Sequence, residues 1–233
     1  MRLDKFLCEM NMGTRSQVKV LIRQGLVRVN DLPAKSADMK IDPDLDQVYY
    51  KGQLLAYRRY VYYMLNKPAG VVSATRDNTA DTVVSLLGDD KRKDVFPVGR
   101  LDKDTTGLLL LTNDGALAHR LLDPKRHVDK VYLVTLEHPL SEADICRLEE
   151  GVDIGEEKLT RPARVEVLDG YHILLSVREG RFHQVKRMLF AVGNGVVQLK
   201  RVSFGSLVLD PDLEEGRYRE LTEEEIALLN AEI

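Results

Sequence analysis

The sequence predicts an α+β fold built from two compact units. Its 233 residues are more than one small domain needs, and 44% of them are hydrophobic, which is enough for packed cores. Residues with helical apolar spacing come first, the pattern changes near residues 54–60, and strand-like and helical runs then alternate irregularly. We expect a small N-terminal domain at residues 1–56 and a larger domain at residues 60–233, in which helices flank a largely antiparallel mixed sheet.

Two short amphipathic helices are expected at the start of the N-terminal domain. The first has apolar residues at the spacing of one helix face, at Leu3, Phe6, Leu7 and Met10. The second repeats this spacing up to Ile22, and Gly25 is placed to end it. Strands at residues 26–29 and 47–50 complete the unit.

In the larger domain, apolar runs bounded by turn residues predict strands, and longer periodic segments predict helices. The expected strands lie at residues 60–66, 71–74, 108–111, 131–136, 164–168, 173–177 and 196–202. The expected helices lie at residues 82–87, 115–122, 143–150 and 182–192 and in the Glu-rich C-terminal segment. Asp169-Gly170 joins two of the strands as an antiparallel hairpin, and Thr222 with Glu225 predicts a capping box for the last helix.

The net charge of −3 conceals an uneven distribution along the chain. Residues 1–35 contain seven Lys and Arg residues against three acids, whereas residues 210–233 contain nine acids against two Arg residues. Arg15, Lys19 and Arg23 recur four residues apart, so they share one face of the second helix, and no acid at helical spacing neutralises them. This face fits either an ordinary solvated surface or a site for RNA phosphates.

The sequence argues against several classes of protein. Cys8 and Cys146 are far apart and lack CxxC or His partners, so neither a disulfide framework nor a zinc site is expected. The chain has no apolar run of about 18 residues and no apolar N-terminal signal segment. Nucleotide-binding loops are also absent from it. We therefore expect a cytoplasmic protein without metal, cofactor or membrane association.

The segment at residues 99–115 is the strongest candidate for chemistry. Four consecutive Leu residues at 108–111 predict a strand buried on both faces, so the acidic loop before it is held rigidly. Arg100 places a fixed positive charge close to the carboxylate of Asp102. From the spacing alone, Asp102 and Asp104 are equally compatible with an ordinary turn, in which such side chains bond their own backbone.

Three further segments contain residues that could take part in a site. Lys67 lies in a Lys-Pro-Ala-Gly turn between two apolar strands. Tyr132 lies in an alternating strand, where by default its ring packs and its hydroxyl finds a partner. Lys186 and Arg187 lie on the basic side of a helix, which by itself fits a solvated face. His183 precedes them, but no His or Asp partner follows at the spacing of a catalytic triad.

The segment GRLDKDTTGLLLLTNDG, at residues 99–115, closely resembles the catalytic motif of the RsuA family of RNA pseudouridine synthases. The segments RLDKFL and TRSQVKVLIRQGLVRVN resemble the small RNA-binding module named after ribosomal protein S-four. Together the two resemblances cover nearly the whole chain. They imply an S-four-like RNA-binding domain followed by a pseudouridine synthase catalytic domain.

The family resemblance implies roles for individual residues. Asp102 would be the essential carboxylate, Tyr132 would stack against the target base, and Lys186 would supply the cation that pairs with Asp102. Arg187 is the alternative cation, because a shift of one residue turns a side chain by about 100° on a helix. Val131 stands where the family usually has Thr, a change that we expect to be harmless. The remaining expected RNA contacts are Arg2, Lys5, Thr14, Arg15, Ser16, Lys19, Arg23, Lys67, Arg100 and Arg187.

The resemblance implies an enzyme that flips one uridine out of structured RNA and isomerises it to pseudouridine. The expected substrate is 16S ribosomal RNA in a small-subunit assembly intermediate, and the protein is expected to act as a monomer. Sister enzymes of 23S RNA share the same motifs, so that substrate stays open, as does a non-catalytic RNA-binding assembly factor. A glycosidase that uses Asp102 and Asp104 is disfavoured, because such enzymes place their acids on opposite sides of a sugar.

Overall fold

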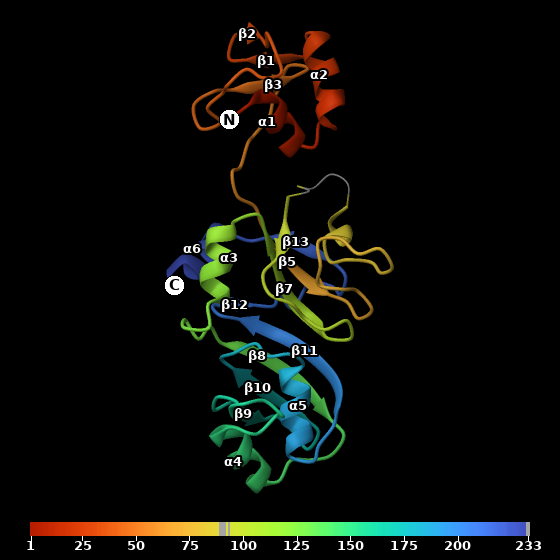
Figure 1. Cartoon of the computed structure of the whole chain (residues 1–233), viewed down its shortest axis with the longest axis vertical. Coiled ribbons are helices and arrows are strands. Elements are labelled where there is room, and N and C mark those ends of the chain that lie inside the picture. The colour runs from red at the N-terminus through yellow and green to blue at the C-terminus, as the bar shows by residue number, and fades with distance from the viewer. Residues whose placement is uncertain (89–91, 93, 232–233) are drawn as a thin grey trace. The chain divides into compact units, whose positions relative to one another are not determined.

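The computed structural model describes residues 1–88, 92 and 94–231, and it separates two compact units (Figure 1). The first unit comprises Met1–Val61 and Leu87–Val95, and the second comprises Tyr62–Leu86 and Phe96–Ile233. The first unit is therefore interrupted in sequence by a segment of the second. Among the described residues, no helix is both long and apolar enough to cross a membrane.

The first unit packs two helices against a small sheet (Figure 1). Helices α1 (Leu3–Glu9) and α2 (Arg15–Arg23) are followed by strands β1 (Val27–Val29), β2 (Leu32–Pro33), β3 (Val48–Tyr50) and β4 (Gln53–Leu54). The strands form an antiparallel sheet in the order β2-β1-β3-β4. Both helices turn their predicted apolar faces inward. The buried cluster that results contains Leu3, Phe6, Leu7, Val18, Ile22, Val27, Val29, Ile41 and Val48.

The second unit is built on a sheet of nine strands. The strands are β5 (Tyr62–Lys67), β6 (Phe96–Pro97), β7 (Thr106–Thr112), β8 (Lys130–Leu136), β9 (Arg164–Val167), β10 (His172–Val177), β11 (Val196–Phe204), β12 (Leu207–Val208) and β13 (Tyr218–Glu220). The main order is β13-β5-β7-β11-β8-β10-β9, while β6 pairs with β7 and β12 pairs with β11. These pairs are antiparallel except for β7 with β11, so the predicted α+β fold with a largely antiparallel mixed sheet is confirmed.

Helices cover the core of the second unit. They are α3 (Gly115–Leu122), α4 (Glu142–Glu150), α5 (Gln184–Ala191) and α6 (Glu223–Ala231). The predicted capping box of α6 is present, because Thr222 and Glu225 exchange side-chain to backbone hydrogen bonds. Residues of α3 and α6 pack with residues of β5, β7 and β11 in one buried cluster. The four Leu residues at 108–111 are 0% exposed, as predicted for a strand that is buried on both faces.

The helix predicted at residues 82–87 is wrong. The structure has only the 3-10 turn η1 (Ser85–Leu87) in this segment. Ser85 donates two hydrogen bonds to Thr82. Its hydroxyl donates to the carbonyl oxygen of Thr82 at 2.7 Å, and its N–H donates to the Thr82 hydroxyl at 3.2 Å. Such local bonds between side chains and backbone compete with the bonds of a continuing helix.

The strand predicted at residues 71–74 is also wrong. Val72 makes one isolated bridge with Thr82, and no ladder extends from it among the described residues. The side chain of Ser73 instead bonds to the backbone of Leu101, in the loop before β7. This segment therefore supports the loop before β7 rather than extending the sheet.

Gly107 occupies a position in β7 where another side chain does not fit. It has a φ of +98°, and a Cβ atom there would lie 2.3 Å from the carbonyl oxygen of Arg201 and 2.8 Å from its nitrogen. The two residues face each other in the parallel pairing of β7 with β11. Gly70 also has a positive φ, of +85°, but nothing lies within 4 Å of its Cβ position.

We expect Gly107→Ala to lower the free energy of unfolding much more than Gly70→Ala. Gly107→Ala combines a positive φ with a clash against fixed backbone, so we expect a loss of about 2–4 kcal/mol in that free energy. Gly70→Ala adds only backbone strain, with an expected loss of about 1 kcal/mol. Urea unfolding followed by circular dichroism measures both. Equal losses in the two variants would contradict a close approach of β7 and β11.

Candidate active site

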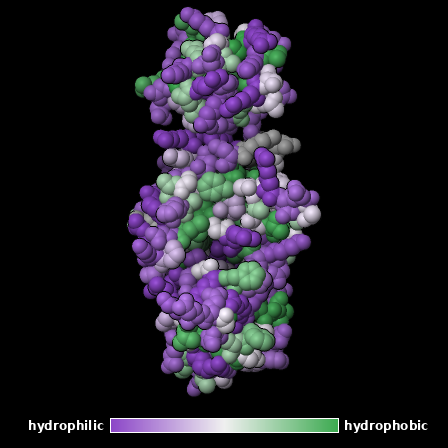
Figure 2. All heavy atoms as spheres, in the orientation of Figure 1, coloured by the Kyte–Doolittle hydropathy of each residue, from purple (hydrophilic) through white to green (hydrophobic). Residues whose placement is uncertain are grey.

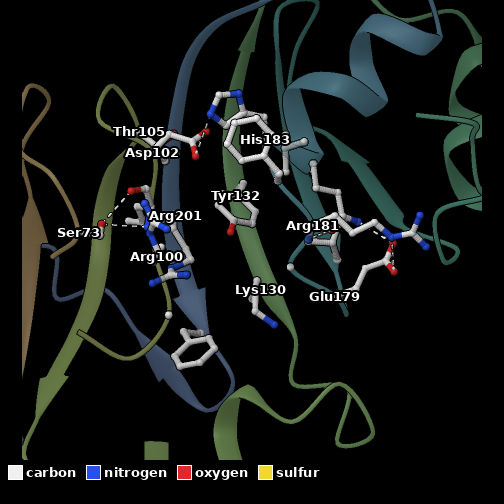
Figure 3. A pocket seen from close by; sticks show the side chains of 18 of the residues that line it. Ser73, Arg100, Asp102, Thr105, Lys130, Tyr132, Glu179, Arg181, His183 and Arg201 are labelled. Carbon is white, nitrogen blue, oxygen red and sulfur yellow. Dashed lines mark hydrogen bonds and ion pairs between the residues drawn. The ribbon is translucent and has the colours of Figure 1, made fainter. Parts of the chain in front are cut away.

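A cavity of about 750 Å³ opens in the second unit. Its walls come from the loop at residues 99–105, the segment that leads into β8, the segment before α5 and the strand β11. Figure 3 shows Asp102, Tyr132 and Arg201 around this space, each from a different part of the chain. The volume lies in the range of pockets that enclose a small organic molecule.

Ser73 fixes the loop on the N-terminal side of Asp102. Its hydroxyl donates to the carbonyl oxygen of Leu101 at 2.8 Å and accepts a hydrogen bond from the Leu101 N–H at 3.0 Å. Both bonds are buried, so they hold the backbone next to Asp102 in one position. The carboxylate of Asp102 is left 27% exposed at the cavity wall. Ser73 was not predicted as a site residue, because its segment was expected to be a strand.

Lys67 anchors the loop on the other side, from inside the protein. Its side chain is fully buried, and Nζ donates to the carbonyl oxygens of Pro68, Lys103 and Thr105 at 3.0, 3.3 and 2.9 Å. The predicted contact of Lys67 with RNA phosphate is therefore wrong, because its ammonium group is enclosed and its three donors are used. Burial lowers the pKa of Lys67 to about 8, while the charge of Asp104 opposes that shift.

Lys186 joins helix α5 to the loop. Its Nζ lies 3.3 Å from Oδ2 of Asp102 and donates to Oδ1 of Asp104 at 2.6 Å. His183 completes the cluster, with Nε2 3.5 Å from Oδ1 of Asp102. Burial disfavours the ammonium form, but the bond with Asp104 and the charges of both carboxylates outweigh it and raise the pKa of Lys186. The same bond lowers the pKa of Asp104, so the two groups are charged at neutral pH.

The backbone at His183 decides which cation faces the loop. His183 has a φ of 47°, in the left-handed region, and α5 begins one residue after it rather than at residue 182 as predicted. Lys186 then faces Asp102, while Arg187 is turned away from it by about 100°. Arg187 donates to Glu156 at 2.6 Å. The structure therefore pairs Lys186, not Arg187, with Asp102. The Arg187 side chain is 29% exposed, and its contact with RNA stays a prediction.

Tyr132 shares the sheet face that lines the cavity with two cations. Tyr132 on β8 lies opposite Arg201 on β11, and Lys130 lies opposite Phe204. Tyr132 is 9% exposed and Arg201 is 2% exposed. Nε of Arg201 donates to the carbonyl oxygen of Leu108 at 2.8 Å. Neither cation was predicted as a site residue from the sequence. The Lys-Val-Tyr spacing could have placed Lys130 on the face of Tyr132, whereas nothing in its strand distinguishes Arg201.

Two further arginines lie at the cavity. Arg100, a predicted RNA contact, is exposed there. Arg181 stabilises the segment before α5, since its guanidinium binds Glu179 at 3.1 Å and the carbonyl oxygens of Lys158 and Leu159 at 2.7 Å each. The described part of the chain contains no group of three His, Cys, Asp or Glu side chains that could hold a metal ion.

The remaining predicted RNA contacts lie in the first unit. All of them are exposed, namely Arg2, Lys5, Thr14, Arg15, Ser16, Lys19 and Arg23. Arg2 and Lys5 have acidic partners, since Arg2 lies 2.8 Å from Asp4 and Lys5 lies 3.6 Å from Glu9. The three cations on α2 have no described carboxylate within 4.0 Å. Hydrophilic side chains cover most of the visible face of this unit (Figure 2).

Comparison with known proteins identifies the family. Residues 61–191 match the family model described as RNA pseudouridylate synthase, and residues 1–46 match the S4 domain. The chain belongs to the RNA pseudouridylate synthase family, and it is a pseudouridine synthase, an isomerase with an S4 RNA-binding domain. Both resemblances seen in the sequence are confirmed.

Full-length relatives support this assignment. The uncharacterized RNA pseudouridine synthase YtzG of Bacillus subtilis is 50% identical, over 99% of this chain and 98% of the relative. Ribosomal small subunit pseudouridine synthase A of Haemophilus influenzae is 45% identical, over 98% of this chain and 99% of the relative. A crystal structure of a pseudouridylate synthase is 44% identical and has a TM-score of 0.71, covering 98% of this chain and 99% of that chain.

The internal anchor at Lys67 can be tested by substitution. Lys67→Met removes three hydrogen bonds and leaves carbonyl oxygens inside the protein without donors, so we expect a loss of about 2–4 kcal/mol in the free energy of unfolding. The exposed Lys103→Met is the control and should change that free energy by less than about 0.5 kcal/mol. Urea unfolding compares them. A Lys67→Met protein of unchanged stability and weakened RNA binding would contradict the anchor.

Proposed function

We propose that this protein isomerises one uridine of 16S ribosomal RNA to pseudouridine, with Asp102 as the catalytic carboxylate. The position of Asp102 carries the proposal, because it meets Lys186 at 3.3 Å at the wall of a cavity that Tyr132 also lines. A carboxylate that is paired with a cation, and an aromatic ring, thus border a space large enough for one nucleobase.

The reaction replaces one bond of uridine by another. The bond between N1 and C1′ breaks, uracil turns in the cavity, and a bond between C5 and C1′ forms. The C5 proton leaves and N1 gains a proton, so the atoms balance without a cofactor. Asp102 acts at the sugar, either by attack on C1′ or by assisting removal of a sugar proton, and both routes use its carboxylate. Lys186 stabilises the negative charge of the Asp102 carboxylate and keeps this carboxylate oriented toward the cavity.

Tyr132 provides the surface for the base. A uridine inside a duplex cannot reach the cavity, so it has to be flipped out of its stack, at a cost of a few kcal/mol. The ring of Tyr132 faces the cavity from β8 and offers a stacking partner that recovers part of this cost. Arg100, exposed at the same cavity, is placed to contact the RNA backbone.

The relatives support the choice of substrate. Several of them are named ribosomal small subunit pseudouridine synthase A, and the one from Haemophilus influenzae aligns over nearly the full length of both chains. We infer that the substrate is one site in 16S RNA, within a small-subunit assembly intermediate. The protein would act there as a monomer, in the cytoplasm, where ribosomal subunits assemble.

The basic face of α2 supports a role in holding the RNA. Arg15, Lys19 and Arg23 are exposed along one helix face without acidic partners among the described residues. Such a face binds phosphates without regard to base sequence, while the cavity acts on the flipped nucleotide. Binding and chemistry would then be divided between the two units.

The catalytic role of Asp102 is tested by Asp102→Asn beside Asp104→Asn. We expect Asp102→Asn to reduce turnover by about 10⁴-fold or more while RNA affinity is largely kept, because the reacting carboxylate is lost but the binding surfaces remain. Asp104→Asn should reduce turnover by no more than about tenfold, since Asp104 is 73% exposed and acts through Lys186.

The measurement is release of tritium from 5-tritiated uridine in 16S RNA or partly assembled small subunits. Wild-type-like release by Asp102→Asn would contradict the assignment. Release from 23S RNA alone would show that the substrate is the RNA of the large subunit instead. Binding without release from either RNA would identify a non-catalytic assembly factor.

The role of the α2 cations is tested by the triple variant Arg15→Ala, Lys19→Ala and Arg23→Ala. Each phosphate contact that is lost should reduce the salt slope of binding, d log K/d log [salt], by about 0.7–0.9. Filter binding to 16S RNA between low and moderate salt measures this slope. An unchanged slope would show that α2 presents an ordinary solvated face.

A further inference from the structure

Lys130 and Arg201 form a pair of cations at the cavity for which the proposed roles of Asp102, Tyr132 and Lys186 give no explanation. Both line the cavity, Lys130 from β8 and Arg201 from the neighbouring strand β11 (Figure 3). Both cations lie near the ring of Phe204, whose centroid is 5.5 Å from Nζ of Lys130 and 5.1 Å from Cζ of Arg201. The charge of Arg201 adds to burial in lowering the pKa of Lys130 to about 8.

This pair makes no close ion pair with a described carboxylate, although the charges of Asp129 and Glu179 act on Lys130 from farther away and partly oppose the lowering of its pKa. Within the described residues, no carboxylate lies within 4.0 Å of Lys130 or Arg201. A buried cation normally has an acidic partner, because removing it from water is unfavourable. Lys130 donates to the carbonyl oxygen of Val128 at 2.9 Å, which uses one of its three donors. Arg201 is 2% exposed, and its Nη2 has no hydrogen-bond partner in the part of the chain that the structure describes.

The unused donors need an acceptor that enters the cavity. Arg201 is fixed through Nε on the Leu108 carbonyl, so its guanidinium is held in place and Nη2 is left to bind a ligand. The substrate in the proposed function brings uracil, whose edge carries the two carbonyl oxygens O2 and O4. When its bond to C1′ breaks, uracil takes the electron pair, and the negative charge spreads over N1, O2 and O4. Fixed cations at these oxygens stabilise such a charge most where water is excluded.

We propose that Lys130 and Arg201 bind the carbonyl oxygens of the flipped uracil and stabilise the negative charge that the base acquires when it leaves C1′. This inference rests on the proposed function and adds two catalytic residues to it. Asp102 and Lys186 then act at the sugar, while Lys130 and Arg201 act at the base.

The same pair explains a preference for uridine over cytidine. Cytosine carries an amino group at C4, which is a donor, where uracil carries the acceptor O4. The amino group of cytosine and the side chain of Lys130 or Arg201 are both hydrogen-bond donors. If they met in the buried site, neither would have an acceptor. A site built around a hydrogen bond rejects the analogue that lacks it by large factors.

The test compares Lys130→Met and Arg201→Met with Lys130→Arg, which keeps the charge. Lys200→Met is the matched control, because Lys200 lies next to Arg201 in β11 but does not line the cavity. Single-turnover release of tritium from 5-tritiated uridine in 16S RNA, assembled into small-subunit particles, gives the rate, and filter binding gives the Kd. Thermal unfolding of each variant checks that it is folded.

We expect each Met variant to lower the single-turnover rate by about 10²-fold or more, with the Kd changed by less than about threefold. Lys130→Arg should stay within about tenfold of the wild type, and Lys200→Met should match it. If Arg201→Met fails to fold, the comparison of Lys130→Met with Lys130→Arg is the test of the inference.

Two outcomes overturn the inference while the proposed function stands. One is a wild-type enzyme that is active on 16S RNA together with Met variants that keep its rate. The other is a loss in Lys130→Met that Lys130→Arg does not restore, which would show that the shape of the side chain, not its charge, is needed. A wild-type protein that releases no tritium from 16S or 23S RNA would refute the proposed function, and this inference with it.

Discussion

The ion pair between Asp102 and Lys186 is the interaction on which the rest of the site depends. Its two side chains are only 27% and 26% exposed, so removal of either one leaves a poorly solvated charge at the cavity. Each partner is positioned independently of the other. Ser73 and Lys67 hold the backbone of the loop, while the left-handed backbone at His183 orients α5. The carboxylate is therefore fixed before any substrate arrives.

The sheet explains why these supports meet at one place. In the register of the strands, Lys67 on β5 faces Gly107 on β7, Gly107 faces Arg201 on β11, and Arg201 faces Tyr132 on β8. One row across four strands thus links the anchor of the loop to the residues that line the cavity. Because Gly107 allows the backbones of β7 and β11 to approach closely, the loop and the cations lie at the same end of the sheet.

Much of the fold could be predicted from local sequence. Helix α3 was expected at residues 115–122 and has the bounds Gly115–Leu122, because Asp114 caps its start and apolar residues mark one face. The segments at 71–74 and 82–87 were mispredicted, since bonds of Ser73 and Ser85 replace regular structure there. The bond of Ser73 is to the distant backbone of Leu101, and the bond of Ser85 competes with the bonds of a helix. The spacing of apolar residues in the sequence shows neither of these bonds.

The candidate site could be predicted only in part. The structure places Asp102 and Tyr132 at one cavity and pairs Lys186 with Asp102, and a motif resemblance had selected all three. The environment of Lys67 could not be predicted, because its burial depends on a loop more than thirty residues later, with which it shares hydrogen bonds. The position of Arg201 at the cavity could not be predicted either. The alternation of side chains along a strand assigns Arg201 to one face of the sheet, but it does not show that this face lines a cavity.

The proposed activity is the formation of one pseudouridine in 16S RNA. The most direct measurement maps pseudouridines by carbodiimide modification and primer extension across 16S and 23S RNA, in cells lacking the gene and in cells to which it is restored. The account predicts that one 16S signal disappears with the gene and returns with it. Persistence of every 16S signal in the deletion cells would contradict it.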